Sequence, residues 1–407
     1  MEVPKAYVAL LAVAVLLSVI SVAYSYSLMS EVRGLLSRQA DVLSSVQADV
    51  SELRSGVSLL SAEFKTLRDL VGGLSVKYEE LSGRLKGVKY PFMVTDSVGR
   101  TVVIKYEPVR LISVGPALTE VLFALGVGNR VVGVDRFSNY PPVLSDLIGN
   151  GSVKVVGDAF SLNVELVASL RPDVIFIAYS TQLEKYIKTL SDLGFTVYVV
   201  RVDDVSDVYN AVLALGFVVN RVDEALKLVD SSMSEMVATY MAVCEYLNRT
   251  GAGRLSVYWE VFPDYWTLGG NAFQSSIVEY AGGVNVFANT SMTWFTASPE
   301  SVISLNPSVI IISYNYGAFG SYQDLVSRIA SRPGWESVRA VRDGRVYVVG
   351  GVAEDVLSRP GPRLALAVKI LARILYPGAF NITQVPVFVG DDVIAGWGLL
   401  KDGLTGS

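Results

Sequence analysis

The feature that most constrains this chain is a fifteen-residue segment that occurs twice. Residues 165–179 read ELVASLRPDVIFIAY and residues 300–314 read ESVISLNPSVIIISY, with nine identical positions. Unrelated segments would share about one position, so we interpret the pair as an internal repeat. Each copy predicts a short helix that begins with a glutamate and ends before a proline, followed by a buried strand. We therefore expect two similar α/β lobes, with the functional site between them.

The composition excludes several classes of function. The 407 residues include no histidine, which excludes Ser-His-Asp and Cys-His catalysis and histidine-ligated zinc or haem iron. The single cysteine, Cys244, excludes intramolecular disulfides and thiolate clusters. The net charge is −5 and no long basic run is present, which argues against nucleic acid as a partner.

The N-terminal residues predict attachment to a membrane. Residues 6–29 are uncharged and long enough to cross a bilayer, so we expect residues 1–29 to form an uncleaved single-pass anchor. Lys5 before this segment favours a cytoplasmic N-terminus and an extracytoplasmic binding domain. A cleaved signal peptide is the competing interpretation. No cysteine lies near the end of the segment, which argues against a bacterial-type lipid anchor.

Residues 30–89 predict a coiled-coil stalk. Apolar residues follow each other in alternating steps of four and three from Leu53 to Val88, and a stutter at residues 42–50 joins this register to an upstream one. Glycines at positions 34, 56, 72, 73 and 83, each weakening a helix by about 1 kcal/mol, argue against a rigid rod. The stalk is either a site of self-association or a single amphipathic helix, and both interpretations place the rest of the protein away from a membrane.

The remaining sequence predicts an α/β fold with two Rossmann-like lobes joined by a single long helix. Strand and helix patterns alternate, as in largely parallel sheets. A hairpin is expected over residues 92–105, and residues 222–247 are the strongest helical candidate. One connecting helix predicts only modest opening and closing. The expected divisions are an N-terminal lobe (90–202), a helical linker (203–253), a C-terminal lobe (254–376) and an unassigned tail (377–407).

The order of several short motifs resembles one known family. Residues 110–142 read RLISVGPALTEVLFALGVGNRVVGVDRFSNYPP, and the pattern continues with NVE at 163–165, AGGVNVF at 281–287 and RPGPR at 359–363. This order is similar to that of the helix-linked (class III) solute-binding proteins of ABC importers, which carry cobalamin, ferric siderophores and haem. The resemblance covers residues 92–376, whereas the anchor, the stalk and the tail lie outside it.

The resemblance implies a non-catalytic receptor. Such a receptor captures a small metal chelate between its lobes and delivers it to an ABC permease dimer with its ATPase subunits. In the family, one glutamate on each lobe engages arginines of the permease, and the matching residues are Glu165 and Glu300, which begin the two repeat copies. A glutamate at a helix N-terminus is also favoured by the helix dipole alone. No cofactor is implied, because the chelate is cargo: a corrinoid, a ferric siderophore or haem.

Aromatic residues follow several predicted strands, and their flat faces suit a broad, partly apolar chelate. Cobalamin binders of the family carry aromatic residues at positions matching Tyr140, Tyr179, Trp266 and Trp294, and an Asp and an Arg at positions matching Asp355 and Arg359. Ala159 stands where those proteins have a tryptophan, with Phe160 adjacent, which leaves the corrinoid assignment open. Arg359 and Arg363 would also suit an anionic siderophore or haem propionates. The predicted ligand-binding residues are Tyr140, Phe160, Tyr179, Trp266, Trp294, Tyr314, Asp355 and Arg359.

Two other classes of function are alternatives to a transport receptor. One is a membrane-anchored enzyme that acts on a metal chelate in the same cleft, for which Asp135, Asp158, Glu260 and Asp355 supply carboxylates. Their spacing matches no metal or glycosidase signature, and the chain has no Walker A motif. The other is a stalked surface protein with a vestigial cleft, against which the Glu165 and Glu300 pair argues.

Overall fold

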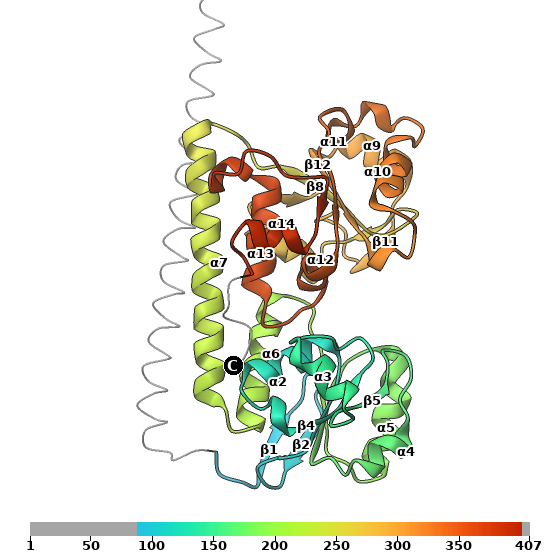
Figure 1. Ribbon diagram of the computed structural model, residues 1–407, viewed down its shortest axis with the longest axis vertical. Coiled ribbons are helices and arrows are strands. Elements are labelled where there is room, and N and C mark those ends of the chain that lie inside the picture. The colour runs from blue at the N-terminus through green and yellow to red at the C-terminus, as the bar shows by residue number, and fades with distance from the viewer. Residues whose placement is uncertain (1–87, 401–407) are drawn as a thin grey trace, which may run out of the picture. The chain divides into compact units, whose positions relative to one another are not determined.

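The computed structural model describes residues 88–400, so the predicted anchor and almost all of the predicted stalk lie outside the described residues. The described part contains two α/β lobes connected by one long helix, α7 (Figure 1). None of the helices between residues 88 and 400 combines the length and the apolar character needed to cross a membrane.

The N-terminal lobe is built on a five-stranded parallel sheet with the order β5-β4-β3-β6-β7. An antiparallel hairpin of β1 and β2 precedes it, as predicted. The elements are β1 (Phe92–Thr95), β2 (Thr101–Ile104), β3 (Leu111–Val114), α2 (Pro116–Ala124), η1 (Gly128–Arg130), β4 (Val131–Asp135), α3 (Val143–Gly149), β5 (Lys154–Gly157), α4 (Val164–Ser169), β6 (Val174–Ala178), η2 (Thr181–Leu183), α5 (Glu184–Asp192) and β7 (Val197–Val200).

Both faces of this sheet are covered, because successive strand residues point to opposite sides. In β6, Phe176 packs in a cluster that includes apolar residues of α2 and α6. Its neighbours Ile175 and Ile177 pack in a second cluster with residues of α4 and α5. This two-sided burial explains why the strand is a continuous apolar run rather than an alternating one.

Two helices follow the N-terminal sheet, α6 (Val205–Val218) and the connecting helix α7 (Val222–Thr250). The α6 helix begins with a capping box of Asp204 and Asp207 and packs in the core of the N-terminal lobe. The α7 helix has 29 residues and ends at Gly251, which has a φ of 67° that favours glycine. Its first half contributes to the N-terminal core and its second half to the C-terminal core. Figure 1 shows α7 running past both groups of helices.

The C-terminal lobe has a mixed sheet with the strand order β11-β9-β8-β12-β13-β14, and β10 also pairs with β8. Strands β8, β12, β13 and β14 are parallel, whereas β9 is antiparallel to both β8 and β11. The elements are β8 (Ser256–Phe262), β9 (Trp266–Leu268), α8 (Phe273–Tyr280), β10 (Val284–Asn285), β11 (Trp294–Thr296), α9 (Pro299–Leu305), β12 (Val309–Ser313), η3 (Asn315–Gly317), α10 (Tyr322–Ala330), η4 (Trp335–Ser337), α11 (Arg339–Arg342), β13 (Val346–Val349), α12 (Gly351–Ser358), α13 (Leu364–Leu375), η5 (Pro377–Phe380), β14 (Phe388–Val389) and α14 (Asp391–Gly396).

The tail left unassigned in the sequence is part of this lobe. Its strand β14 pairs with β13, with Val348 opposite Phe388 and Val349 opposite Val389. Ile394 of α14 is fully buried in the same core as α12 and α13. These elements are defined by contacts with β13, α12 and α13, which lie outside the tail. The sequence of the tail has no periodic pattern of its own, so it did not predict them.

The two repeat copies form α4 with β6 and α9 with β12, so the duplication predicted from the sequence is a duplication of structure. Asn163 and Ser298 are the N-caps, and each side chain accepts a backbone N–H three residues later. At the other end, Arg171 and Asn306 occupy equivalent positions and both have a left-handed backbone, with φ of 47° and 44°. The copies therefore share their turn geometry as well as their sequence.

Candidate functional site

The loops at the carboxyl ends of β3 and β4 are held together by Asp135. Its buried carboxylate accepts the backbone N–H of Gly115 and of Phe137, both at 2.8 Å, and the hydroxyl of Ser138 at 2.7 Å. Gly115 has a φ of 132°, and a Cβ at this position would lie 2.7 Å from the Cβ of Ala178. The chain starts the sheet at the central strand β3, adds β4 and β5 on one side, and then adds β6 and β7 on the other side. Asp135 therefore organises a topological switch point, where α/β sheets bind ligands.

The α2 helix leaves this switch point and carries Glu120, a buried carboxylate. Its Oε2 accepts Nε of Arg363 at 2.7 Å. Its Oε1 accepts Nη2 of Arg363 at 2.6 Å and Nη1 of Arg359 at 3.1 Å. Both arginines lie between α12 and α13, on the other lobe. One carboxylate of the N-terminal lobe thus holds two guanidinium groups of the C-terminal lobe.

Arg359 makes further contacts across the same boundary. It donates to Oδ1 of Asn139 at 2.7 Å and forms an ion pair of 2.9 Å with Asp355 on its own lobe. Asn139 returns a hydrogen bond from Nδ2 to Oδ2 of Asp355 at 3.2 Å. Asn139 follows β4, so the carboxyl end of the N-terminal sheet meets the end of α12. We call Glu120, Asn139, Tyr140, Asp355, Arg359 and Arg363 the cross-lobe cluster.

Tyr140 joins this cluster through its ring. The guanidinium carbon of Arg363 lies 4.1 Å from the ring centre, a cation–π distance. Burial raises the pKa of the Tyr140 hydroxyl above its ordinary value, and nearby Glu120 adds to the shift while Arg363 opposes it. Of the predicted ligand-binding residues, the structure brings together Tyr140, Asp355 and Arg359. Sequence reasoning missed Glu120 and Asn139.

Phe160 lies on a separate loop, after β5. Asp158 shapes this loop by accepting the backbone N–H groups of Phe160 and Ser161 at 2.9 and 2.8 Å. The bond from Phe160 holds the pKa of the Asp158 carboxyl below its usual value. The Phe160 ring is 62% exposed, which is unusual for an aromatic side chain and leaves its faces available for a ligand.

Trp266 and Trp294 form an aromatic face on the C-terminal lobe. Trp266 begins β9 opposite Phe262 at the carboxyl end of β8, and it pairs with Thr296 of β11. Trp294 is two residues from Thr296, so the two indoles lie on one face of the β9–β11 pair. They are 41% and 44% exposed. Two large apolar residues therefore remain accessible on this lobe, and Trp266 lies beside the carboxyl end of β8.

The two tyrosines that end the repeat copies have different surroundings. The hydroxyl of Tyr179 donates to Glu184 at 2.6 Å, which raises its pKa, and its ring lies beneath Arg201 at 5.6 Å. The ring of Tyr314 instead packs edge-on against Phe388 at 5.2 Å, within the core of its lobe. The surroundings of Tyr179 are therefore polar, as expected at a ligand site, whereas those of Tyr314 are apolar.

Glu165 and Glu300, the predicted permease contacts, are both exposed. Each is the second residue of its helix, α4 or α9, after the capping residue and one further residue. Their backbone amides belong to the first turn, where a negative side chain is favoured by the helix dipole. The structure therefore places the two carboxylates at equivalent positions on the two lobes.

The four carboxylates considered for an enzyme do not form one centre. Asp135 and Asp158 are bound to their own loops, and Asp355 is paired with Arg359. Glu260 accepts two 2.7 Å bonds from Arg332 within the C-terminal lobe. Among residues 88–400, no group of three or more acidic or cysteine side chains is arranged to hold a metal ion.

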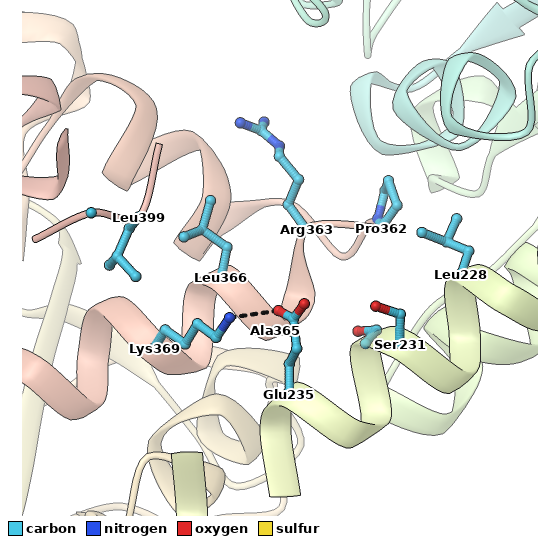
Figure 2. Close-up of a pocket in the computed structure, with 11 residues that line it drawn as sticks. Leu228, Ser231, Glu235, Pro362, Arg363, Ala365, Leu366, Lys369 and Leu399 are labelled. Atoms are coloured by element: carbon cyan, nitrogen blue, oxygen red, sulfur yellow. Dashed lines mark hydrogen bonds and ion pairs between the residues drawn. The ribbon is translucent and has the colours of Figure 1, made fainter. Parts of the chain in front are cut away.

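A cavity of about 350 Å³ lies behind the cross-lobe cluster, between α7 and α13 (Figure 2). Glu235 of α7 and Lys369 of α13 form a 2.6 Å ion pair at this cavity. In Figure 2 the side chain of Arg363 points away from that ion pair, and its guanidinium binds Glu120 instead. In the described part of the chain, none of the eight predicted ligand-binding residues lines this cavity.

A family model described as periplasmic binding protein matches residues 111–353, from β3 into α12. The chain belongs to this family. The expectation from the sequence motifs is confirmed, and the protein is a substrate-binding protein of an ABC importer rather than an enzyme. It is accordingly an extracytoplasmic binding protein.

Three relatives of this periplasmic binding protein are similar over most of its length. The uncharacterized ABC transporter substrate-binding lipoprotein YvrC of Bacillus subtilis is 29% identical over 300 residues, covering 72% of this chain and 88% of the relative. The molybdate-binding protein MolA of Haemophilus influenzae is 25% identical over 315 residues, covering 73% and 86%. A cobalamin-binding protein of Halobacterium salinarum is 25% identical over 305 residues, covering 74% and 77%.

The fold is also similar to that of a solved periplasmic binding protein. The crystal structure of a possible iron-binding (periplasmic solute-binding) protein from Staphylococcus epidermidis is 28% identical in sequence and has a TM-score of 0.57. It covers 67% of this chain and 100% of its own. Proteins similar to this chain thus bind ligands that differ in size and charge, so the fold alone does not determine the ligand.

Proposed function

We propose that this protein captures a metal chelate of the corrinoid or ferric siderophore class between its lobes and delivers it to an ABC permease dimer. The observation that carries the proposal is the set of exposed aromatic residues on both lobes. Phe160 stands on the N-terminal lobe, and Trp266 and Trp294 stand on the C-terminal lobe. Aromatic faces bind broad, flat and partly apolar ligands, whereas a small oxyanion would leave them unused.

The polar residues at one end of this site support the same ligand class. Asp355 and Arg359 stand at positions that resemble those of cobalamin binders, and both lie in the cross-lobe cluster. Arg359 keeps 12% of its side chain exposed, so part of this donor group is accessible from outside the cluster. Aromatic faces together with a few oriented polar groups are the usual composition of a small-molecule site.

We further propose that Glu165 and Glu300 dock the receptor on the permease. Two exposed carboxylates in equivalent positions on similar lobes suit a partner with two-fold symmetry. The anchor predicted for residues 1–29 and the stalk after it would keep the receptor on the extracytoplasmic side of the cell membrane, close to this partner.

The ligand proposal is tested by titrating the purified full-length protein, in detergent, with cyanocobalamin, a ferric siderophore, haemin and molybdate. Binding of cyanocobalamin or the siderophore should change the visible spectrum and raise the melting temperature, because a ligand that binds only the folded state stabilises it. If neither chelate produces a shift while molybdate or haemin does, the proposed ligand class is wrong.

A further inference from the structure

The cross-lobe cluster contains two carboxylates and two guanidinium groups. Arg363 is bound by both oxygens of Glu120, and Arg359 is shared between Glu120 and Asp355. All four side chains are at least 88% buried, with exposed fractions from 2% for Glu120 to 12% for Arg359. The positive charge of the arginines is therefore balanced inside the protein before any ligand arrives.

This balance has a consequence for the charge of the ligand. An anion must lose its hydration water to enter a buried site. The free-energy cost of that loss is offset only if the site contains positively charged donors that are not already paired with carboxylates. Here an anion would have to displace Asp355 or Glu120 from the guanidinium groups. A ligand with no net charge loses less hydration, and it needs from Arg359 only one hydrogen bond to a neutral acceptor.

Glu120 is the residue on which the balance depends. It forms ion pairs with both arginines, whereas the ion pair of Asp355 is with Arg359. It also comes from the opposite lobe, on a helix whose other buried side chains are three apolar residues and Thr119. We propose that Glu120 is a specificity-determining residue that acts through the two arginines and makes the receptor select chelates without net charge over anionic ones. This inference deepens the proposed function and rests on it.

The variant that tests this role is Glu120→Gln, which keeps the size of the side chain and one accepting oxygen but removes its charge. Three probes are compared by titration calorimetry: cyanocobalamin, a cyanocobalamin derivative with one peripheral amide hydrolysed to a carboxylate, and molybdate. The wild-type protein should bind both the carboxylate derivative and molybdate more weakly than cyanocobalamin. In the variant, the affinity for both anionic probes should increase by about tenfold relative to wild type.

The matched control is Glu260→Gln. It also removes the charge of a buried carboxylate that holds an arginine through two 2.7 Å bonds, but Glu260 and Arg332 lie within the C-terminal lobe. It should lower the melting temperature without any gain in anion affinity. If Glu120→Gln does not fold, Asp355→Asn removes the other carboxylate, and the same gain of anion affinity is expected.

The outcomes separate the two proposals. If the wild type binds neither cyanocobalamin nor a ferric siderophore, the proposed ligand class is refuted. Tight binding of molybdate by the wild type would overturn the role of Glu120 without any variant. A folded Glu120→Gln or Asp355→Asn protein with unchanged affinity for both anions would overturn it as well, as would an equal gain in Glu260→Gln.

Discussion

The guanidinium of Arg363 lies 4.1 Å from the ring centre of Tyr140, and the two residues belong to different lobes. The same guanidinium is bound by both carboxylate oxygens of Glu120. Arg363 thus covers one face of a ring that the sequence motifs predict as a ligand contact. The arrangement makes Arg363, together with Arg359, a connection between the two lobes, and it can be tested by substitution.

Arg363→Lys should weaken this connection. A lysine keeps the charge but cannot donate two parallel bonds or lie flat on a ring, so the free energy of unfolding should fall by about 2 kcal/mol. The measurement is chemical denaturation combined with amide hydrogen exchange. The control Arg332→Lys breaks a similar pair inside the C-terminal lobe. Faster exchange in α2 is expected only for Arg363→Lys, and equal exchange in the two variants would contradict the connecting role.

Trp266→Ala and Trp294→Ala should weaken chelate binding without loss of stability. Both rings are more than 40% exposed, so their removal leaves no core cavity. Each substitution should lower the affinity for the chelate by about 1–3 kcal/mol, which is roughly fivefold to 150-fold. Equilibrium titration measures the affinity for the chelate, and thermal melting measures the stability. Met93→Ala, which removes an apolar residue that is 73% exposed from β1, is the control and should change neither quantity.

The double variant Glu165→Ala and Glu300→Ala should abolish uptake of the chelate by cells while its affinity for the receptor remains unchanged. Each single variant should retain part of the transport, because one carboxylate still meets the permease. The control is Glu224→Ala, which removes an exposed glutamate from the first turn of α7. A parallel loss of chelate affinity in the double variant would place these glutamates in the ligand site or the fold.

The contact between α6 and α7 predicts a dependence of stability on alkaline pH. Burial raises the pKa of Tyr209 to about 12, and its hydroxyl lies 3.1 Å from that of Ser232. Since the pKa of an unfolded tyrosine is about 10, the stabilising contribution is complete below that pH and is lost as the pH rises through 12. The loss should reach about 2–3 kcal/mol in denaturation curves between pH 10 and 12. Tyr209→Phe should reduce this loss, and parallel curves for the two proteins would refute the assignment.

The repeat allowed the fold to be predicted because its signals are local. Helix, proline and strand lie within fifteen residues, and both copies form the predicted α/β half-unit. The tail shows the opposite case. Its strand β14 is only two residues long and is defined by pairing with β13, so no periodic pattern in residues 377–407 indicates it.

The candidate site was only partly predictable for the same reason. Asp355 and Arg359 are four residues apart and suggest an ion pair from the sequence alone. Glu120 is 243 residues from Arg363, and no spacing rule connects them. One signal was nevertheless present, because Glu120 is the only charged residue in the apolar run from Leu118 to Leu125. A single charge in such a run needs a buried partner, although the sequence does not identify that partner.

The α7 helix contributes Ala225 and Val229 to one core and Met236 and Val243 to the other. Large rotation of the lobes would therefore have to bend or detach this helix, so we expect the separation of Glu165 and Glu300 to be nearly the same with and without ligand. A transporter that recognises the receptor by these two carboxylates would then bind empty and loaded copies alike. Empty receptors become competitors for the permease, and the rate of import should fall when receptor is in excess over its ligand.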